Sequence, residues 1–315
     1  MANSSIFCAV TAVLTVPAFL LAQTPVRPQI EQSRQFTGPP GTIDLQGQRN
    51  APTAGAFDGT GTSDDAFGTQ VIFKRQDQPR PFTAFAEMGA FMTNNVALAK
   101  VDPLEDGFLV ATTGIAFTRH FAFNLRLDAG AQASAYRYDK FPQLDFQSTD
   151  LSVGVAWSPP ALRGAEVLLR YTFTDLTTAE RTREFYKNHA ILLGIQRIVP
   201  FSRAQAVYFG AGAQWSFADP QPAGRDEYTA YAGYRAQLTR HVDADLYYRY
   251  GRYVYRFGEG RQDNNQTVSL SLHYTPSEWL SFSAACFVGV NRSNRTVFDY
   301  DVANVGVGFQ ASIRF

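Results

Sequence analysis

The end of the chain alternates strictly between apolar side chains and polar or small ones. One parity holds Val305, Val307, Phe309, Ala311, Ile313 and Phe315. The other parity holds Asn304, Gly306, Gly308, Gln310, Ser312 and Arg314. Because successive side chains of a β-strand point to opposite faces, this pattern predicts a strand with one fully apolar face.

The same alternation recurs earlier in the chain, and there the polar face carries charges. The segment from Val242 separates Val242, Ala244, Leu246, Tyr248 and Tyr250 from Asp243, Asp245, Tyr247, Arg249 and Gly251. The segment from Phe121 separates Phe121, Phe123, Leu125, Leu127 and Ala129 from Asn124, Arg126, Asp128 and Gly130. A soluble β-sandwich also alternates. Charges in the middle of long strands favour a water-filled barrel interior with lipid outside.

About twelve such segments follow one another, each close to the ~9–11 residues that cross a bilayer at a tilt. We expect strands at 82–94, 108–119, 121–137, 147–158, 165–176, 186–199, 204–217, 227–240, 242–256, 265–276, 279–291 and 302–315. The sequence therefore predicts an all-β protein, a closed antiparallel transmembrane β-barrel.

The connections between these segments alternate between short and long. The short ones lie at 118–120, 158–164, 200–203, 239–241 and 276–278. The long ones lie near 95–107, 138–146, 177–185, 218–226, 257–264 and 292–301. An even number of strands places both termini beside the short turns. This is the arrangement of outer-membrane barrels in a Gram-negative-type envelope, with periplasmic turns and termini and longer extracellular loops.

The residues before the barrel divide into two parts. Residues 6–21 form a long apolar run, too short for a spanning helix and followed by Ala22, which predicts a signal peptide over residues 1–22. Residues 23–80 begin with a stretch rich in Pro, Gly, Thr and Gln that has no hydrophobic period. We expect a disordered, low-complexity periplasmic segment there, or a plug that enters the barrel. The barrel itself is expected over residues 81–315.

Composition and motifs narrow the function classes. Lys and Arg total 28, as do Asp and Glu, so the net charge of zero argues against a nucleic-acid partner. Cys8 lies in the leader, which leaves Cys286 without a disulfide partner. The chain has no H-E-x-x-H, P-loop or G-x-S-x-G motif, so no cofactor, metal or catalytic set is predicted. His273 shares a strand face with Ser269 and Ser271, but no third catalytic group is identified.

Charged residues on the polar parity are the candidate functional residues. We expect the following side chains to line the lumen: Glu87, Arg126, Asp128, Arg170, Arg235, Asp243, Asp245, Arg249 and Arg314. They either fill a narrow barrel as Arg–carboxylate ladders or form a mixed-charge constriction that selects solutes. Tyr231 and Tyr247 share their inward direction and could stack on sugar faces. Aromatic residues at the loop-side strand ends are expected in an interfacial girdle: Tyr136, Trp215, Tyr228, Tyr255, Phe298 and Tyr300.

The C-terminal region resembles a known class of protein. The stretch Asn291–Arg295, followed by Phe298–Asp301 and a Gly-rich last strand, resembles the outer-membrane β-barrel porins found near exopolysaccharide and exosortase loci. The resemblance implies a pore or an export-associated barrel and supplies no catalytic residue. The last strand, with Phe309, Ile313 and Phe315, looks like the signal read by the barrel-assembly machinery.

Three functions remain open at this point. The leading hypothesis is a channel or porin for small solutes, or an export-associated pore. The second is a non-conducting scaffold or adhesin whose loops bind a surface partner, and the third is a barrel hydrolase that acts on lipid or glycan. The expected partners are outer-membrane lipid, the barrel-assembly machinery and a small solute or polysaccharide.

Overall fold

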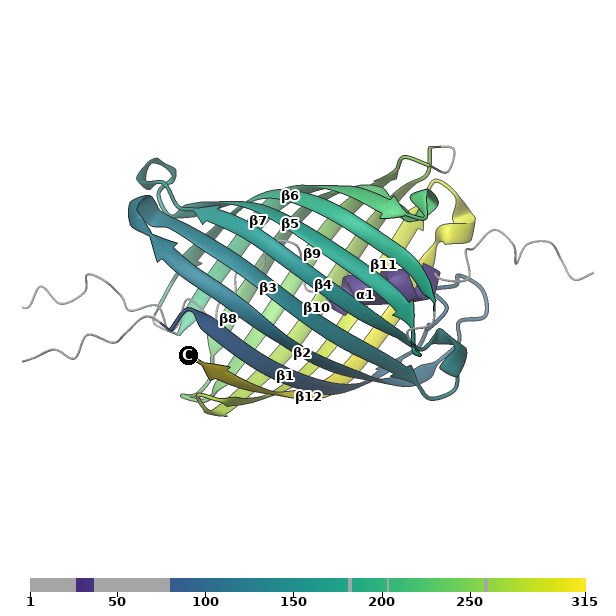
Figure 1. Cartoon of the computed structure of the whole chain (residues 1–315), viewed down its shortest axis with the longest axis horizontal. Coiled ribbons are helices and arrows are strands. Elements are labelled where there is room, and N and C mark those ends of the chain that lie inside the picture. Colours follow the sequence, from purple (N-terminus) through teal and green to yellow (C-terminus); the bar gives the residue numbers. More distant parts are fainter. Residues whose placement is uncertain (1–26, 37–79, 181–182, 203, 258–259) are drawn as a thin grey trace, which may run out of the picture.

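A computed structural model describes residues 27–36, 80–180, 183–202, 204–257 and 260–315. Within these ranges twelve antiparallel strands form a closed barrel (Figure 1). The strands are β1 (Phe82–Thr93), β2 (Asp106–Phe121), β3 (Leu125–Tyr138), β4 (Phe146–Trp157), β5 (Ala165–Thr178), β6 (Glu184–Pro200), β7 (Gln205–Asp219), β8 (Arg225–Gln237), β9 (Val242–Tyr255), β10 (Gln262–Ser277), β11 (Leu280–Ser293) and β12 (Tyr300–Arg314). The predicted fold class, an all-β closed antiparallel transmembrane barrel, is confirmed.

The barrel closes where the last strand meets the first. Thr83 of β1 lies opposite Arg314 of β12, and the register continues without a break along both strands. At the end of this seam the backbone N–H of Phe82 donates to the carbonyl of Phe315 at 3.1 Å, and the reverse bond measures 3.0 Å. Because no strand keeps a free edge, the backbone polar groups of the wall are paired within the sheet, as lipid requires.

The two faces of the wall differ as the alternation predicts. In β9, Leu246 and Tyr248 are 49% and 43% exposed, whereas Asp243 and Tyr247 are 3% and 7% exposed. In this strand, large apolar side chains therefore cover the outer face, and charged and hydroxyl groups face inward. An apolar outer belt around a polar interior is the pattern that a bilayer selects.

The largest difference between a predicted and an observed strand boundary is at the start of β3. The strand expected from residue 121 begins at Leu125, because Phe123 and Asn124 adopt φ angles of 62° and 57° in the turn η2 (Ala122–Asn124). Left-handed backbone interrupts the pleat, so the facing assigned to Phe123 by alternation does not apply. Its side chain is 90% exposed in the turn. The turn expected at 118–120 belongs to β2 instead.

The connections at the two barrel ends differ less in length than the sequence suggests. At the end that holds the C-terminus, here called the turn end, they span 122–124, 158–164, 201–204, 238–241 and 278–279. At the other end, here called the loop end, they span 94–105, 139–145, 179–183, 220–224, 256–261 and 294–299. The turn 158–164 is as long as the loop 139–145. Connection length alone therefore does not orient the barrel, and the orientation stays a prediction.

A helix lies inside the barrel, near its loop end. α1 (Arg27–Phe36) is drawn in purple in Figure 1 and is enclosed by the strands of the barrel. Its Ile30 and Gln32 side chains are 3% and 0% exposed. Among the described residues no helix is long and apolar enough to cross a membrane. The predicted signal peptide and most of the segment 23–80 lie outside the described residues.

Candidate functional site

An apolar contact holds one side of α1 against the wall. Ile30 packs into a cluster of buried side chains from β2 to β6 and the first loop: Val96, Phe108, Val110, Tyr136, Tyr138, Phe146, Leu176 and Tyr186. Tyr136, Tyr255 and Tyr300, predicted for the interfacial girdle, are 3%, 5% and 4% exposed. That prediction is wrong for these three residues, because they carry the inward parity and pack around α1 and its neighbours.

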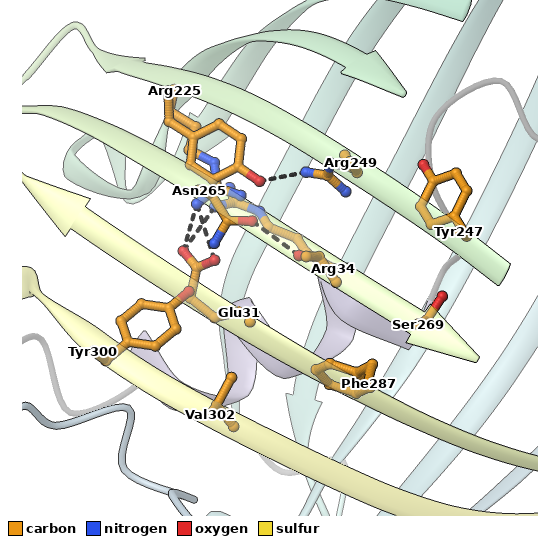
Figure 2. Close-up of a pocket in the computed structure, with 13 residues that line it drawn as sticks. Glu31, Arg34, Arg225, Tyr247, Arg249, Asn265, Ser269, Phe287, Tyr300 and Val302 are labelled. Atoms are coloured by element: carbon orange, nitrogen blue, oxygen red, sulfur yellow. Dashed lines mark hydrogen bonds and ion pairs between the residues drawn. The ribbon is translucent and has the colours of Figure 1, made fainter. Parts of the chain in front are cut away.

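Ion pairs hold a second side of α1. Glu31 accepts two hydrogen bonds from Nη1 of Arg225 in β8, at 2.7 and 2.9 Å (Figure 2). The Nε of the same guanidinium donates to Glu227 at 2.7 Å. Its Cζ lies 3.8 Å from the centre of the Tyr253 ring. Arg225 is buried, so α1 supplies one of the two carboxylates that neutralise a cation removed from water.

Two arginines of α1 connect the helix to the loops. Arg34 donates to the Tyr186 hydroxyl at 2.8 Å and to the carbonyl of Ala223 at 3.1 Å. Arg27 donates to the carbonyl of Phe298 at 3.3 Å, and its guanidinium lies 4.9 Å from the centre of the Phe298 ring. Ala223 and Phe298 belong to the connections after β7 and β11. The helix therefore joins two loops as well as the wall.

The charge of Glu31 persists at low pH. Burial alone would raise the pKa of its carboxyl, but the attraction of Arg225, Arg34 and Arg27 outweighs burial and lowers the pKa from 4.5 to about 2. A carboxyl with a depressed pKa contributes stability that is present above its ordinary pKa and is lost as the pH falls towards 2. Docking through Glu31 is therefore independent of pH across the neutral range.

A second group of charges lies closer to the turn end and joins four strands. Arg126 donates to Asp128 at 2.9 Å and pairs with Glu166 at 3.2 Å. Gln196 donates to the same Glu166 at 3.1 Å, and the Tyr231 hydroxyl donates to Gln196 at 3.1 Å. This arrangement has the form of an Arg–carboxylate ladder, in which each member gains a partner from another strand.

Three tyrosines gather on the inner face of β7, β8 and β9. The Tyr208 ring lies 6.3 Å from that of Tyr247, which in turn lies 5.9 Å from that of Tyr231. The Tyr208 hydroxyl donates to Asp245 at 2.8 Å. Because all three rings are buried against one another, their faces are already used, which leaves little ring surface for the sugar stacking expected of Tyr231 and Tyr247.

The other candidates that the sequence proposes for the lumen differ in their pairing. Arg235 lies 3.8 Å from Asp243, and Arg249 lies 3.6 Å from Glu227 and donates to the Tyr253 hydroxyl. A further set shares the inward parity but forms no ion pair with any described residue: Glu87, Arg170 and Arg314. Arg170 is half-buried, whereas Glu87 and Arg314 are exposed.

The pattern along the sequence does not mark the residues that contact α1. It places Arg225 in a loop and Glu227 at the edge of a strand, although both share the parity of Thr229 and Tyr231 in β8. If the alternation of this strand is extended towards the N-terminus as far as Arg225, it places both side chains on the inner face. Glu31 lies in a segment without hydrophobic period, so no comparable signal points to it.

A cavity of about 140 Å³ lies between α1 and the wall (Figure 2). Glu31 and Arg34 line it from the helix, and Arg225 and Arg249 line it from β8 and β9. Phe287 of β11 also lines it. The cavity therefore brings three guanidinium groups next to one carboxylate at the loop end of the lumen.

His189 and His273 lie within strands, and their neighbours differ. The sheet register places His273 opposite Asp243 on one side and opposite Ser283 on the other. Besides a Ser, a His and an Asp, acyl transfer needs hydrogen-bond donors directed at an oxyanion, often backbone N–H groups. The backbone N–H groups around His273 belong to the paired strands β9 to β11. His189 contacts the Tyr171 hydroxyl at 2.7 Å on the exposed outer face. Within the described ranges no three His, Cys, Asp or Glu residues are grouped to hold a metal ion.

Comparisons with known proteins find likeness in fold rather than in sequence. No protein-family model and no curated protein sequence matches the chain. An outer-membrane channel from Pseudomonas putida F1 has a similar structure, with a TM-score of 0.53 and 8% identity over 78% of this chain and 100% of that chain. A bacterial polysaccharide outer-membrane secretin reaches a TM-score of 0.44 at 11% identity, over 76% of this chain and 100% of that one. At such identities the likeness shows the fold alone, that of an outer-membrane β-barrel.

Proposed function

We propose that the protein is an outer-membrane channel for small solutes whose loop end is narrowed by α1. The observation that carries the proposal is the interior of the closed barrel. Outside the apolar cluster around Ile30, charged and hydroxyl side chains line the inner wall, and a cavity stays open beside the helix. Removal of an ion from water costs several kcal/mol, and the attraction within a buried pair often does no more than offset that cost. A barrel that served only as a rigid support would gain more from an apolar filling, whereas a polar lumen suits water and polar solutes.

In this proposal α1 is a plug for the loop end. Its contacts through Ile30, Glu31 and Arg34 support the plug alternative for that part of the segment 23–80. We propose the division of the chain stated above, with a signal peptide over 1–22 and the barrel over 81–315.

A non-conducting scaffold is the second candidate function, and the same helix is the observation that favours it. A lumen held closed by the pair between Glu31 and buried Arg225 would pass little solute. We propose a non-enzymatic role in either case, because the backbone N–H groups around His273 belong to the paired strands β9 to β11.

Single-channel recording of the refolded, purified protein in a planar bilayer tests the channel. We expect discrete conductance steps from the full-length chain, small ones because α1 occupies part of the lumen. A bilayer that stays silent across the voltage range would favour the scaffold.

Arg170→Gln is expected to shift ion selectivity towards cations. Arg170 is half-buried on the inner face of β5 and forms no ion pair with any described residue, so its charge acts on permeant ions. The shift is measured as a change in reversal potential across a KCl gradient. Arg292→Gln serves as the matched control, because Arg292 is paired with Asp301 on the exposed outer face. Equal reversal potentials in parent and Arg170→Gln would place Arg170 away from the conducting path.

We propose that the loop end faces the cell exterior and that both termini are periplasmic. An epitope inserted between Asp102 and Pro103, which are exposed in the first loop, should be stained by antibody on intact cells. The loop 220–224 is a poorer site, because the carbonyl of Ala223 accepts a hydrogen bond from Arg34. Staining that requires permeabilised cells would reverse the proposed orientation.

The last strand is the proposed assembly signal. Phe309, Ile313 and Phe315 are exposed on the outer face of the wall, at 44%, 68% and 56%. An aromatic and aliphatic row at the closing strand suits recognition by the barrel-assembly machinery before closure and contact with outer-membrane lipid afterwards.

A further inference from the structure

The guanidinium of Arg225 is arranged as a binding site for a carboxylate. Its Nε edge is fixed by Glu227 at 2.7 Å, and its face lies on the Tyr253 ring at 3.8 Å. Its Nη1 donates to both oxygens of Glu31 and to the Tyr255 hydroxyl at 3.1 Å. Of these partners, only Glu31 comes from α1. The barrel wall therefore holds the arginine in place, and the helix fills its remaining edge.

Space for a solute lies directly beside this contact. Glu31, Arg34 and Arg225 all line the cavity of about 140 Å³ (Figure 2). Arginine forks bind planar carboxylates with directional, charge-assisted hydrogen bonds. β10 adds three neutral side chains to the lining that both donate and accept hydrogen bonds: Asn265, Thr267 and Ser269. Cations at one side and neutral polar groups at another suit a molecule with one carboxylate and several hydroxyls.

Two polar groups at the cavity lack partners. The hydroxyl of Tyr247, a residue 7% exposed, and the Nε of Arg249 form no hydrogen bond with any described residue. A buried polar group without a partner loses about 1–3 kcal/mol relative to one that is satisfied. A polar ligand in the cavity would give both groups a hydrogen-bond partner.

We infer that the loop end of the lumen binds a small hydroxylated carboxylate, of the size and chemistry of a sugar acid, and that Glu31 of α1 occupies the carboxylate position until such a solute displaces it. The solute carboxylate takes the Nη1 edge of Arg225, and its hydroxyls face β10. Binding and release of α1 are then coupled, because both compete for the same guanidinium. The inference rests on the proposed channel for the route of the solute, but equilibrium binding does not require conduction.

Isothermal titration of the refolded full-length protein in detergent, with D-glucuronate as the probe, tests this competition. The parent should bind weakly. Glu31→Gln keeps the side-chain shape but removes the competing charge, so its affinity for D-glucuronate should rise by about tenfold or more. Asp226→Asn is the matched control. It removes a carboxylate from an ion pair with Arg256 outside the lumen and should leave the affinity unchanged.

Two further changes complete the test: removal of an arginine from the site, and removal of the carboxylate from the probe. Arg225→Gln should abolish binding, provided that the variant keeps the heat-modifiable gel mobility of a folded barrel. Arg249→Gln, at a less buried site, should weaken binding by about fivefold or more. D-Glucose, which lacks the carboxylate, should not bind. Equal affinities of parent and Glu31→Gln, or equal binding of both sugars, overturn the inference. Retained D-glucuronate binding in a protein that never conducts would overturn the channel and leave the binding site standing.

Discussion

Leu246→Arg is expected to prevent stable insertion of the barrel, whereas Asp245→Asn is expected to leave insertion intact. Leu246 lies on the outer face of β9, opposite Leu270 and Tyr234, and an arginine at mid-bilayer on that face costs about 2–4 kcal/mol. Asp245 faces the lumen and accepts a hydrogen bond from Tyr208, which the amide oxygen of an Asn can also accept.

Refolding of both variants into lipid vesicles, followed by denaturant unfolding and heat-modifiable gel mobility, measures the difference. The two residues are neighbours in one strand, so each serves as the control for the other. Equal resistance to denaturant in both variants would mean that the outer face of β9 does not contact lipid.

Glu31→Lys is expected to release α1 from the lumen. The change leaves Arg225 and Arg34 beside a new cation in a buried site, and loss of one partner from a buried ion pair costs about 3–5 kcal/mol. Hydrogen exchange of the backbone amides of residues 27–36 reports docking, slow in the parent and fast in the variant.

The matched control for this change is Glu105→Lys. The Glu105 side chain is 81% exposed and pairs with Lys140 at the surface, where an ion pair contributes little. In Glu105→Lys, the backbone amides of residues 27–36 should exchange at the same rates as in the parent. Protection of α1 that survives Glu31→Lys would assign the docking to Ile30 and the apolar cluster instead.

The barrel could be predicted from the sequence because lipid and water impose opposite demands on the two faces of each strand. The parity of Asp243, Leu246 and Tyr247 therefore predicts their sides of the wall directly. The prediction failed at Phe123, because left-handed backbone in the turn ends the alternation. It failed as well for Tyr136, Tyr255 and Tyr300, whose place at strand ends suggested a lipid interface although their parity pointed inward.

The contacts of the site depend on information that alternation does not carry. Parity gives the side on which Arg126 lies, but its pairing with Glu166 follows from the register of three strands. The bond between Arg225 and Glu31 joins residues 194 positions apart. α1 has few apolar residues, because Ile30 makes its contact with the apolar cluster, whereas Arg27, Glu31 and Arg34 are matched by charged and aromatic partners.

The unitary conductance of the full-length protein, compared with that of a variant lacking residues 27–36, tests most directly whether this barrel is a channel narrowed by α1. Both proteins are refolded, checked for barrel mobility on gels and recorded under the same salt. We predict discrete steps in both, larger by roughly twofold or more in the variant, because removal of the helix widens the open cross-section of the lumen. Steps of equal size in the two proteins, or silence in both, would contradict this account.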